Sequence, residues 1–211
     1  MSNIGYGKKE LKIFRKLNSP KKIQDFLNKL KNNFEEQGDT CYSPQSALKQ
    51  KKAHCMEGAM LAAAVLEFHG QRPLVLDLRS ESHDFDHVVA VFKQFGCFGA
   101  ISKTNHAVLR YREPIYQTIR ELVLSYFHEY FDSKGRKTLR EFSNPFDLNY
   151  FNNLEWRTSK KNLFKIPDYL DRIKHFKILS KVQIKNLRLA DKIEIKAGEI
   201  VEWKKSKKQS K

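Results

Sequence analysis

The sequence predicts an α+β protein whose central helix packs on an antiparallel sheet. The segment 55–69 is apolar on every face of a helix and stops at Gly70, which indicates a buried helix. Three strand-like runs follow it, at 74–79, 87–92 and 97–102, and polar or glycine-bearing turns separate them. A helix followed by an antiparallel meander fits this order best.

Two amphipathic helices are expected ahead of this core, at residues 8–17 and 23–34. Ser19 is suited to cap the second helix, and Pro20 is suited to its first turn. We expect both helices to pack on the core as an N-terminal arm. Residues 37–44 then form a loop that leads to the central helix.

Beyond the three strands, residues 114–131 predict a long helix with apolar side chains on one side. An aromatic-rich stretch without clear periodicity follows at 142–156. Alternating short runs between residues 182 and 201 predict a small hairpin or edge strands. The sequence therefore indicates three parts, which are an N-terminal helical arm (1–40), a core (41–131) and a basic C-terminal extension with short strands (132–211).

A chain of 211 residues is long enough for one domain with extensions and a substantial core. Its three cysteines show no paired pattern, which favours a reducing compartment over a disulfide-linked secreted fold. The N-terminus has no apolar signal stretch, and the longest apolar run, 59–66, is too short to span a bilayer. We expect a soluble, cytoplasmic protein without a membrane span.

The formal net charge is +16, and residues 157–211 hold 17 Lys and Arg against 6 Asp and Glu. Basic segments neutralise phosphates without a recognition motif, so nucleic-acid or anionic-surface binding through the C-terminal part is the main rival to an enzymatic function. No zinc-finger spacing, RNP-like aromatic motif or glycine-rich phosphate loop accompanies this charge.

Cys55 stands at the start of the central helix, where unpaired backbone N–H groups and the helix dipole favour thiolate over thiol. Three lysines just upstream add positive charge. His87 opens the second strand, and from there it can accept the thiol proton and later protonate a leaving group. A cysteine and a histidine placed in this way predict acyl-transfer chemistry.

This order of parts resembles the transglutaminase-like branch of the papain-like cysteine hydrolase superfamily, over residues 43–116. The resemblance rests on Cys-Met-Glu-Gly-Ala from Cys55 and on Asp-His-Val-Val-Ala-Val around His87. It implies that Cys55 is the nucleophile and His87 the general base and acid. That family places an orienting acid on the next strand, where this sequence has none, so Ser102 and Asn105 are the two candidates for that role. The chemistry requires neither a metal nor a small-molecule cofactor.

A metal site is an alternative interpretation of residues 83–87, since two histidines and two carboxylates lie within five residues. No distant partner at a familiar zinc spacing supports it. Asp86 is next to His87 in sequence, but strand geometry predicts that it points to the opposite face.

Other residues near Cys55 also have two interpretations. Cys55 itself is compatible with a small core residue. Glu57 is expected either to favour the helix dipole or to recognise a substrate amine. His54 is expected to face away from its neighbour Cys55. A catalytically inactive relative that serves as a basic nucleic-acid- or protein-binding module therefore stays open as the alternative function. The acyl substrate, the choice between hydrolysis and transfer, and the oligomeric state are not indicated.

Overall fold

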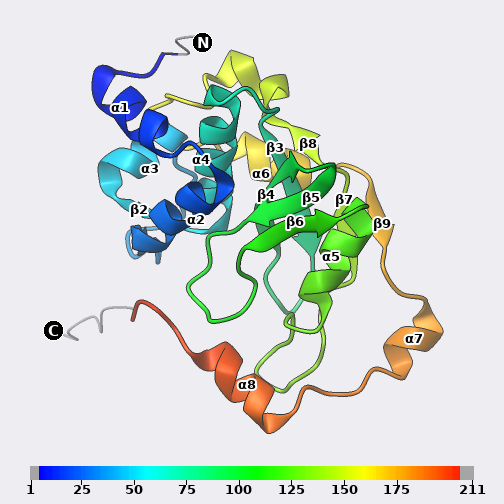
Figure 1. Ribbon diagram of the computed structural model, residues 1–211. Coiled ribbons are helices and arrows are strands. Elements are labelled where there is room, and N and C mark those ends of the chain that lie inside the picture. The colour runs from blue at the N-terminus through cyan, green and yellow to red at the C-terminus, as the bar shows by residue number, and fades with distance from the viewer. Residues whose placement is uncertain (1–4, 205–211) are drawn as a thin grey trace, which may run out of the picture.

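The computed structural model describes residues 5–204 and confirms an α+β fold built on one antiparallel sheet (Figure 1). The sheet has seven strands, in the order β6-β5-β4-β3-β7-β9, and β8 pairs with the start of β3. These strands are β3 (Leu74–Arg79), β4 (His87–Gln94), β5 (Cys97–Ile101), β6 (Arg112–Tyr116), β7 (Glu141–Ser143), β8 (Phe146–Asp147) and β9 (His175–Lys177).

Helices cover both faces of this sheet (Figure 1). The helices of the described residues are α1 (Lys8–Lys16), α2 (Pro20–Lys29), α3 (Pro44–Gln50), α4 (Cys55–Phe68), α5 (Ile119–Phe127), the 3-10 helix η1 (Leu148–Leu154), α6 (Lys165–Leu170), α7 (Lys181–Lys185) and α8 (Lys192–Glu199), of which α7 and α8 lie away from the sheet. Two short parallel strands, β1 (Lys31–Asn32) and β2 (Lys52–Ala53), form a separate pair just before α4.

The buried helix α4 lies between the sheet and the N-terminal helices, and it contacts β4, β3, α2 and α3. Successive side chains of β4 alternate between two cores. Val88 and Ala90 belong to the core around α4, whereas Val89 and Val91 belong to the core around α5. Because both faces of the sheet are covered, residues 88–92 of β4 are all apolar.

The N-terminal arm follows the prediction at its centre. Ser19 caps α2, its side chain accepting a hydrogen bond from the backbone N–H of Lys22, and Pro20 occupies the first turn. The predicted end of this helix at residue 34 is wrong. The helix ends at Lys29, because the chain then becomes extended and pairs with β2.

The predicted helix at 114–131 begins too early. Its first residues belong to β6, and α5 begins after Thr118, whose side chain accepts a hydrogen bond from the backbone N–H of Glu121. β6 is an edge strand, and an edge strand tolerates Pro114 because a proline without an N–H leaves no partner unsatisfied there.

The hairpin or edge strands predicted between residues 182 and 201 are wrong, since this region holds α7 and α8. Each helix has a capping box, formed by Ser180 with Gln183 and by Asp191 with Glu194. Such reciprocal side-chain bonds satisfy the first N–H groups of a helix, and they outweigh the local alternation of apolar residues.

Part of the predicted C-terminal extension joins the central sheet. β7 pairs with β3, and β9 pairs with β7, so the sheet continues across residue 131. Trp156 is fully buried in the core around α4. Of the basic tail at 204–211, only Lys204 lies within the described residues. No helix between residues 5 and 204 is long and apolar enough to cross a bilayer.

Candidate active site

A cleft of about 660 Å³ opens at the N-terminal end of α4. Its wall includes the start of α4, the residues just before and at the start of β4, the loop after β5, and one side of α8. Both residues singled out by the sequence, Cys55 and His87, line this cleft, and so does Asn105. The fold therefore brings the predicted nucleophile and base to one accessible place.

Cys55 is the first residue of α4 and is partly exposed in the cleft. Its sulfur accepts hydrogen bonds from two imidazoles, those of His54 and His87. Burial by itself would raise the pKa of the Cys55 thiol, but these hydrogen bonds and the positive charge of the two rings lower it to about 5. The favoured state is a thiolate held between two histidines. Cys41, by contrast, is buried, and burial raises its pKa far above the ordinary value.

His54 faces Cys55, so the prediction that it faces elsewhere is wrong. It is the N-cap of α4, with extended backbone angles of φ −92° and ψ −174°, and helical side-chain spacing does not apply to such a residue. Its Nε2 lies 3.1 Å from the carbonyl oxygen of Thr40. Burial by itself would lower the pKa of His54, but the bond to Cys55, the thiolate charge and nearby Glu57 raise it to about 9.

Glu57 is fully buried and lies beneath His54, with 3.4 Å between Oε1 and the imidazole Nε2. Its carboxylate accepts hydrogen bonds from the side chains of Asn33 and Thr40 and from the backbone N–H groups of Tyr42 and His54, at 2.9–3.2 Å. A substrate amine cannot reach it, so that interpretation is wrong. Glu57 instead fastens the loop before α3 to the helix start and balances the charge of the His54 imidazolium.

His87 is oriented by Ser102, with 2.8 Å between His87 Nε2 and Ser102 Oγ. The Ser102 hydroxyl donates its single proton to the carbonyl oxygen of Leu109, at 2.6 Å, so it accepts the bond from His87. Nε2 therefore carries a proton, and Nδ1 is the nitrogen left for the Cys55 sulfur. Of the two orienting candidates from the sequence, the structure brings Ser102 to His87.

Gln24 of α2 fixes the backbone of Ser102. Its side-chain Oε1 accepts from the Ser102 N–H at 2.9 Å, and its Nε2 donates to the Ser102 carbonyl at 2.8 Å. Sequence inspection gave no signal for this contact, because 78 residues separate the partners. The N-terminal arm therefore takes part in positioning the histidine.

Asn105 does not orient His87. Its side-chain amide pairs with the backbone of Trp203, donating from Nδ2 to the carbonyl and accepting the N–H at Oδ1, both at 2.9 Å. The expectation that Asn105 serves as the third catalytic residue is therefore wrong. Its contact secures the C-terminal segment beside the cleft, where α8 contributes to the wall.

Residues 83–87 do not form a metal site as a unit, because the two histidines turn to different partners. His83 lies between Glu81 and Asp132, at 3.5 and 3.3 Å, whereas His87 bonds to Ser102 and Cys55. Asp86 turns away from His87, as predicted, and accepts hydrogen bonds from the backbone and side chain of Ser80.

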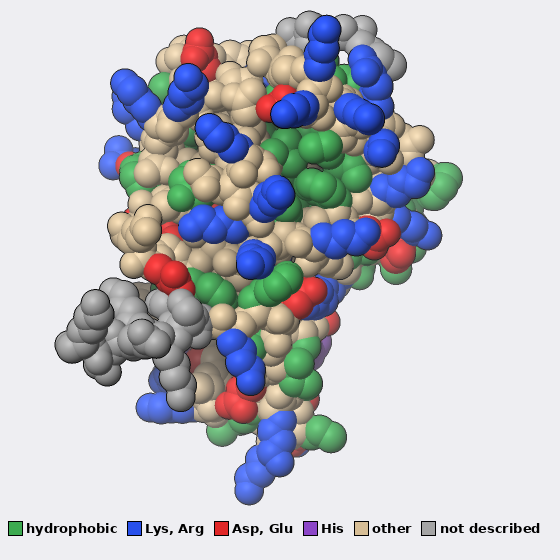
Figure 2. Space-filling view, turned by 90° about the vertical axis from the view of Figure 1, so that its left-hand side faces the viewer, with side chains coloured by type: hydrophobic (Ala, Val, Ile, Leu, Met, Phe, Trp, Pro, Cys, Tyr) green, Lys and Arg blue, Asp and Glu red, His purple; other side chains and the backbone are tan. Residues whose placement is uncertain are grey.

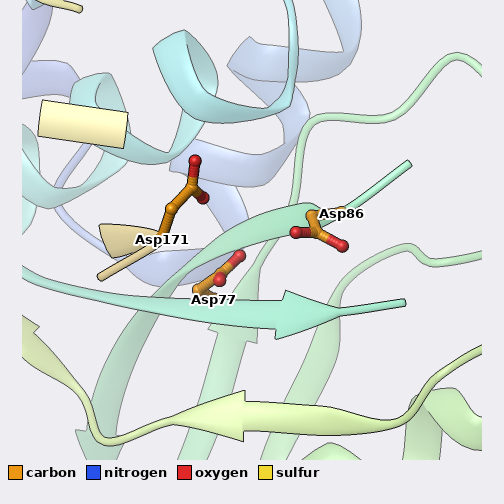
Figure 3. Close-up of side chains that lie close together, drawn as sticks. All are labelled: Asp77, Asp86 and Asp171. Carbon is orange, nitrogen blue, oxygen red and sulfur yellow. The ribbon is translucent and has the colours of Figure 1, made fainter. Parts of the chain in front are cut away.

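A cluster of three carboxylates includes Asp86 and is completed by Asp77 of β3 and by Asp171 (Figure 3). One oxygen from each lies within 4.8 Å of the others. Burial and the neighbouring negative charge of Asp77 raise the pKa values of Asp86 and Asp171. Asp77 is already paired with His175 Nε2 at 2.8 Å. Carboxylates in this arrangement are suited to a hard divalent cation, but the bonds that Asp77 and Asp86 make within the protein are sufficient to explain their positions.

No protein-family model matches this chain, and no curated protein is significantly similar to it in sequence. The geometry around Cys55 is therefore the basis on which a function can be proposed.

Proposed function

We propose that this protein is a thiol-dependent enzyme that performs acyl transfer or hydrolysis on an amide, isopeptide or thioester. The observation that carries this proposal is the position of Cys55, whose sulfur accepts hydrogen bonds from His54 and His87 at the start of a buried helix. A thiol of lowered pKa in an open cleft is the form of cysteine suited to nucleophilic catalysis.

In the first half of the reaction, the Cys55 thiolate attacks the substrate carbonyl carbon and forms a C–S bond. The carbonyl oxygen takes up negative charge, which the backbone N–H groups at the start of α4 stabilise, since these groups lack intrahelical acceptors. His87 then gives a proton to the leaving amine or thiol as its bond to the carbonyl carbon breaks. The product is an acyl thioester on Cys55.

In the second half, water or an amine attacks the thioester. His87 accepts a proton from the attacking group, and the Cys55 thiolate leaves as the C–S bond breaks. This sequence returns the site to its starting state. No redox partner is involved, because every step is a nucleophilic displacement at an acyl carbon.

The two histidines divide the work in this mechanism. Glu57 stabilises the protonated form of His54, so the imidazolium of His54 remains charged and keeps Cys55 ionised. His87 is bound by a neutral hydroxyl rather than a carboxylate, and it is assigned the proton transfers. The resemblance to transglutaminase-like hydrolases agrees with the roles of Cys55 and His87 but provides no counterpart for His54.

The experiment that tests this proposal is acylation by p-nitrophenyl acetate, followed by intact-protein and peptide mass spectrometry. We expect one acetyl group on Cys55 within the first turnover and slower release of acetate, because the thioester is the intermediate. Cys55→Ser is expected to abolish the adduct, and the matched control Cys97→Ser is expected to leave it unchanged. Acetylation that spreads equally over Cys55 and Cys97 would refute the proposal.

A second candidate function is that of a basic binding module that uses the same fold without catalysis. Residues 8–52 hold twelve Lys and Arg against five Asp and Glu, and all twelve except Lys52 are exposed. Figure 2 shows Lys and Arg side chains spread across the face that includes α1, with few acidic side chains between them. Fluorescence anisotropy with a labelled single-stranded oligonucleotide tests this candidate. It requires binding that weakens as salt rises and that survives Cys55→Ala.

A further inference from the structure

We infer that the cleft selects acyl substrates that carry a positively charged side chain next to the attacked carbonyl, with Phe85 and the carboxylates of the cleft rim as the binding groups. This inference rests on the proposed function, because it names the substrate class of the same site. Three independent features of the cleft support it, which are its charge, the exposure of Phe85 and its size.

The charge of the cleft is opposite to that of the whole molecule. The chain has 40 Lys and Arg against 24 Asp and Glu, yet the cleft is lined by six carboxylates against one lysine and the cationic His54, with three further histidines. These acidic residues are Glu35, Asp84, Asp86, Glu129, Asp132 and Glu199. A concave site in which negative charge predominates concentrates cationic ligands, because its walls focus the field.

Several of these carboxylates have no cation beside them within the protein. Glu129 pairs with Arg112 and Asp132 pairs with Arg136. Asp84, Asp86 and Glu199 form no ion pair with Lys or Arg among residues 5–204. The one lysine of the wall, Lys103, is buried and donates to the Leu30 carbonyl at 2.6 Å, so its ammonium group is engaged away from solvent.

Phe85 lies on the cleft wall two residues before His87, and its side chain is 88% exposed. Its backbone is nevertheless fixed, because the N–H donates to Asp84 Oδ1 and the carbonyl accepts from the Tyr130 hydroxyl. An aromatic ring held on a rigid backbone and left open to water is preorganised for a ligand. Asp84 and Asp86 stand directly before and after Phe85 in the sequence. The negative face of the aromatic ring and the charge of these carboxylates both favour a cationic ligand.

The cleft volume of about 660 Å³ exceeds what one side chain occupies and lies within the range of sites for small organic ligands. Phe85 and Cys55 both line it, so one cavity holds the place for a basic side chain on Phe85 and the place for its carbonyl at Cys55. The favoured occupant is therefore a lysyl or arginyl acyl group, bound as part of a peptide.

The test uses three affinity labels that alkylate a thiolate with loss of chloride, which are the chloromethyl ketones of acetyl-lysine, acetyl-norleucine and acetyl-glutamate. Norleucine has a side chain similar to that of lysine but without the charge, so the comparison isolates the ammonium group. The second-order rate of Cys55 labelling is measured by intact mass in the full-length protein. We expect the lysine label to react about fivefold faster than the norleucine label, and the glutamate label to be slowest.

Two variants connect this preference to the named residues. Phe85→Ala and Glu199→Gln are expected to reduce the ratio of lysine to norleucine rates, and rising salt is expected to do the same. Both side chains are exposed, so neither change removes core packing. Phe95→Ala is the matched control, because Phe95 is 85% exposed in the turn between β4 and β5 and does not line the cleft.

Iodoacetamide, which has no charged side chain, reports the reactivity of Cys55 alone, so it separates the proposed thiol chemistry from the inferred substrate preference. Fast iodoacetamide labelling of Cys55 together with equal rates for the three ketones would overturn the substrate inference alone. A lysine preference that neither Phe85→Ala nor Glu199→Gln reduces would also overturn it. Cys55 labelling by iodoacetamide no faster than that of Cys97 would overturn the proposed function, and the inference with it.

Discussion

At the residue scale, Cys55 differs from the other two cysteines in what surrounds its sulfur. Two imidazoles donate to it, and one of them, His54, rests on a buried carboxylate. The sequence places His54, Cys55 and Glu57 within four residues. This proximity by itself does not indicate that His54 contacts the Cys55 sulfur. Their roles emerge only when the N-cap geometry turns the side chain of His54 toward the sulfur.

The first prediction concerns the pH dependence of Cys55 alkylation by iodoacetamide. Since the pKa of the thiol is about 5, the rate is expected to rise with pH through a midpoint near 5 instead of near 9. His54→Ala and His87→Ala each remove a donor to the thiolate, so the midpoint moves upward and the rate at pH 6 falls about tenfold. Mass spectrometry of the Cys55 peptide measures it, with Cys97 as internal reference. A midpoint that neither substitution moves would contradict the assignment.

The second prediction concerns the stability that Glu57 provides. Glu57→Gln replaces an acceptor of four groups with an amide that brings two donors of its own, so donors meet donors in a buried site. We expect a loss of about 3 kcal/mol in the free energy of unfolding, measured by urea denaturation. Asp25→Asn on the exposed side of α2 is the control, with an expected change within about 0.5 kcal/mol. Equal effects of the two changes would show that the buried network contributes little.

At the element scale, the site depends on contacts between elements that are distant in sequence. α2 supplies Gln24 to hold Ser102, the loop after β5 supplies the Leu109 carbonyl that accepts from Ser102, and β4 supplies His87. These contacts also separate the two orienting candidates, Ser102 and Asn105. Both residues follow β5, but only Ser102 lies within hydrogen-bond distance of the imidazole.

The third prediction separates these two residues by substitution. Ser102→Ala removes the acceptor that fixes the His87 ring, so the rate of acetyl release from Cys55 is expected to fall about tenfold or more. Asn105→Ala removes the contact to Trp203 and is expected to change that rate less than about twofold, because it leaves the His87 hydrogen bond intact. Single-turnover kinetics with p-nitrophenyl acetate measure both. A larger effect from Asn105→Ala than from Ser102→Ala would reverse the assignment.

At the scale of the whole molecule, the sheet joins parts that the sequence suggests are separate. β7 and β9 come from the region expected to be an extension; β7 pairs with β3, and β9 pairs with β7. α8 and the segment up to Trp203 lie against residues 105–107 beside the cleft. Cys55 therefore stands at the start of the central helix, while the cleft wall also includes residues from near the end of the chain.

The fourth prediction concerns the pH dependence of unfolding. Cys55 has a lowered pKa in the folded protein, so its contribution to stability is complete above the unfolded value near 9 and is lost as pH falls through about 5. His54 has a raised pKa, so its contribution is complete below about 6.5 and is lost as pH rises through about 9. The ion pair between the Cys55 thiolate and the His54 imidazolium therefore stabilises the fold mainly between pH 5 and 9.

Cys55→Ser is expected to lower the free energy of unfolding by about 2 kcal/mol at pH 7 and by much less at pH 4, where the wild-type thiol is already protonated. Urea denaturation at both pH values measures the difference. The matched control is Cys97→Ser, for which no such pH dependence is expected. A Cys55→Ser effect that is the same at both pH values would argue against an ion pair.

The sequence by itself determined the features that depend on local pattern. Continuous apolar residues specify the buried helix α4, the three runs after it specify β3, β4 and β5, and Cys55 and His87 stand at the starts of two of these elements, from which both line one cleft. These predictions succeed because periodicity, caps and turn residues act over a few neighbouring positions.

Only the tertiary structure decided which polar groups meet. Ser102 reaches His87 while Asn105 reaches Trp203, His54 turns toward Cys55, and β7 extends the sheet from β3. Each of the hydrogen bonds made by Ser102 and Asn105 depends on a partner whose location the local sequence does not specify. Side-chain hydrogen bonds need distances near 3 Å and suitable angles, and the packing of distant elements sets those distances.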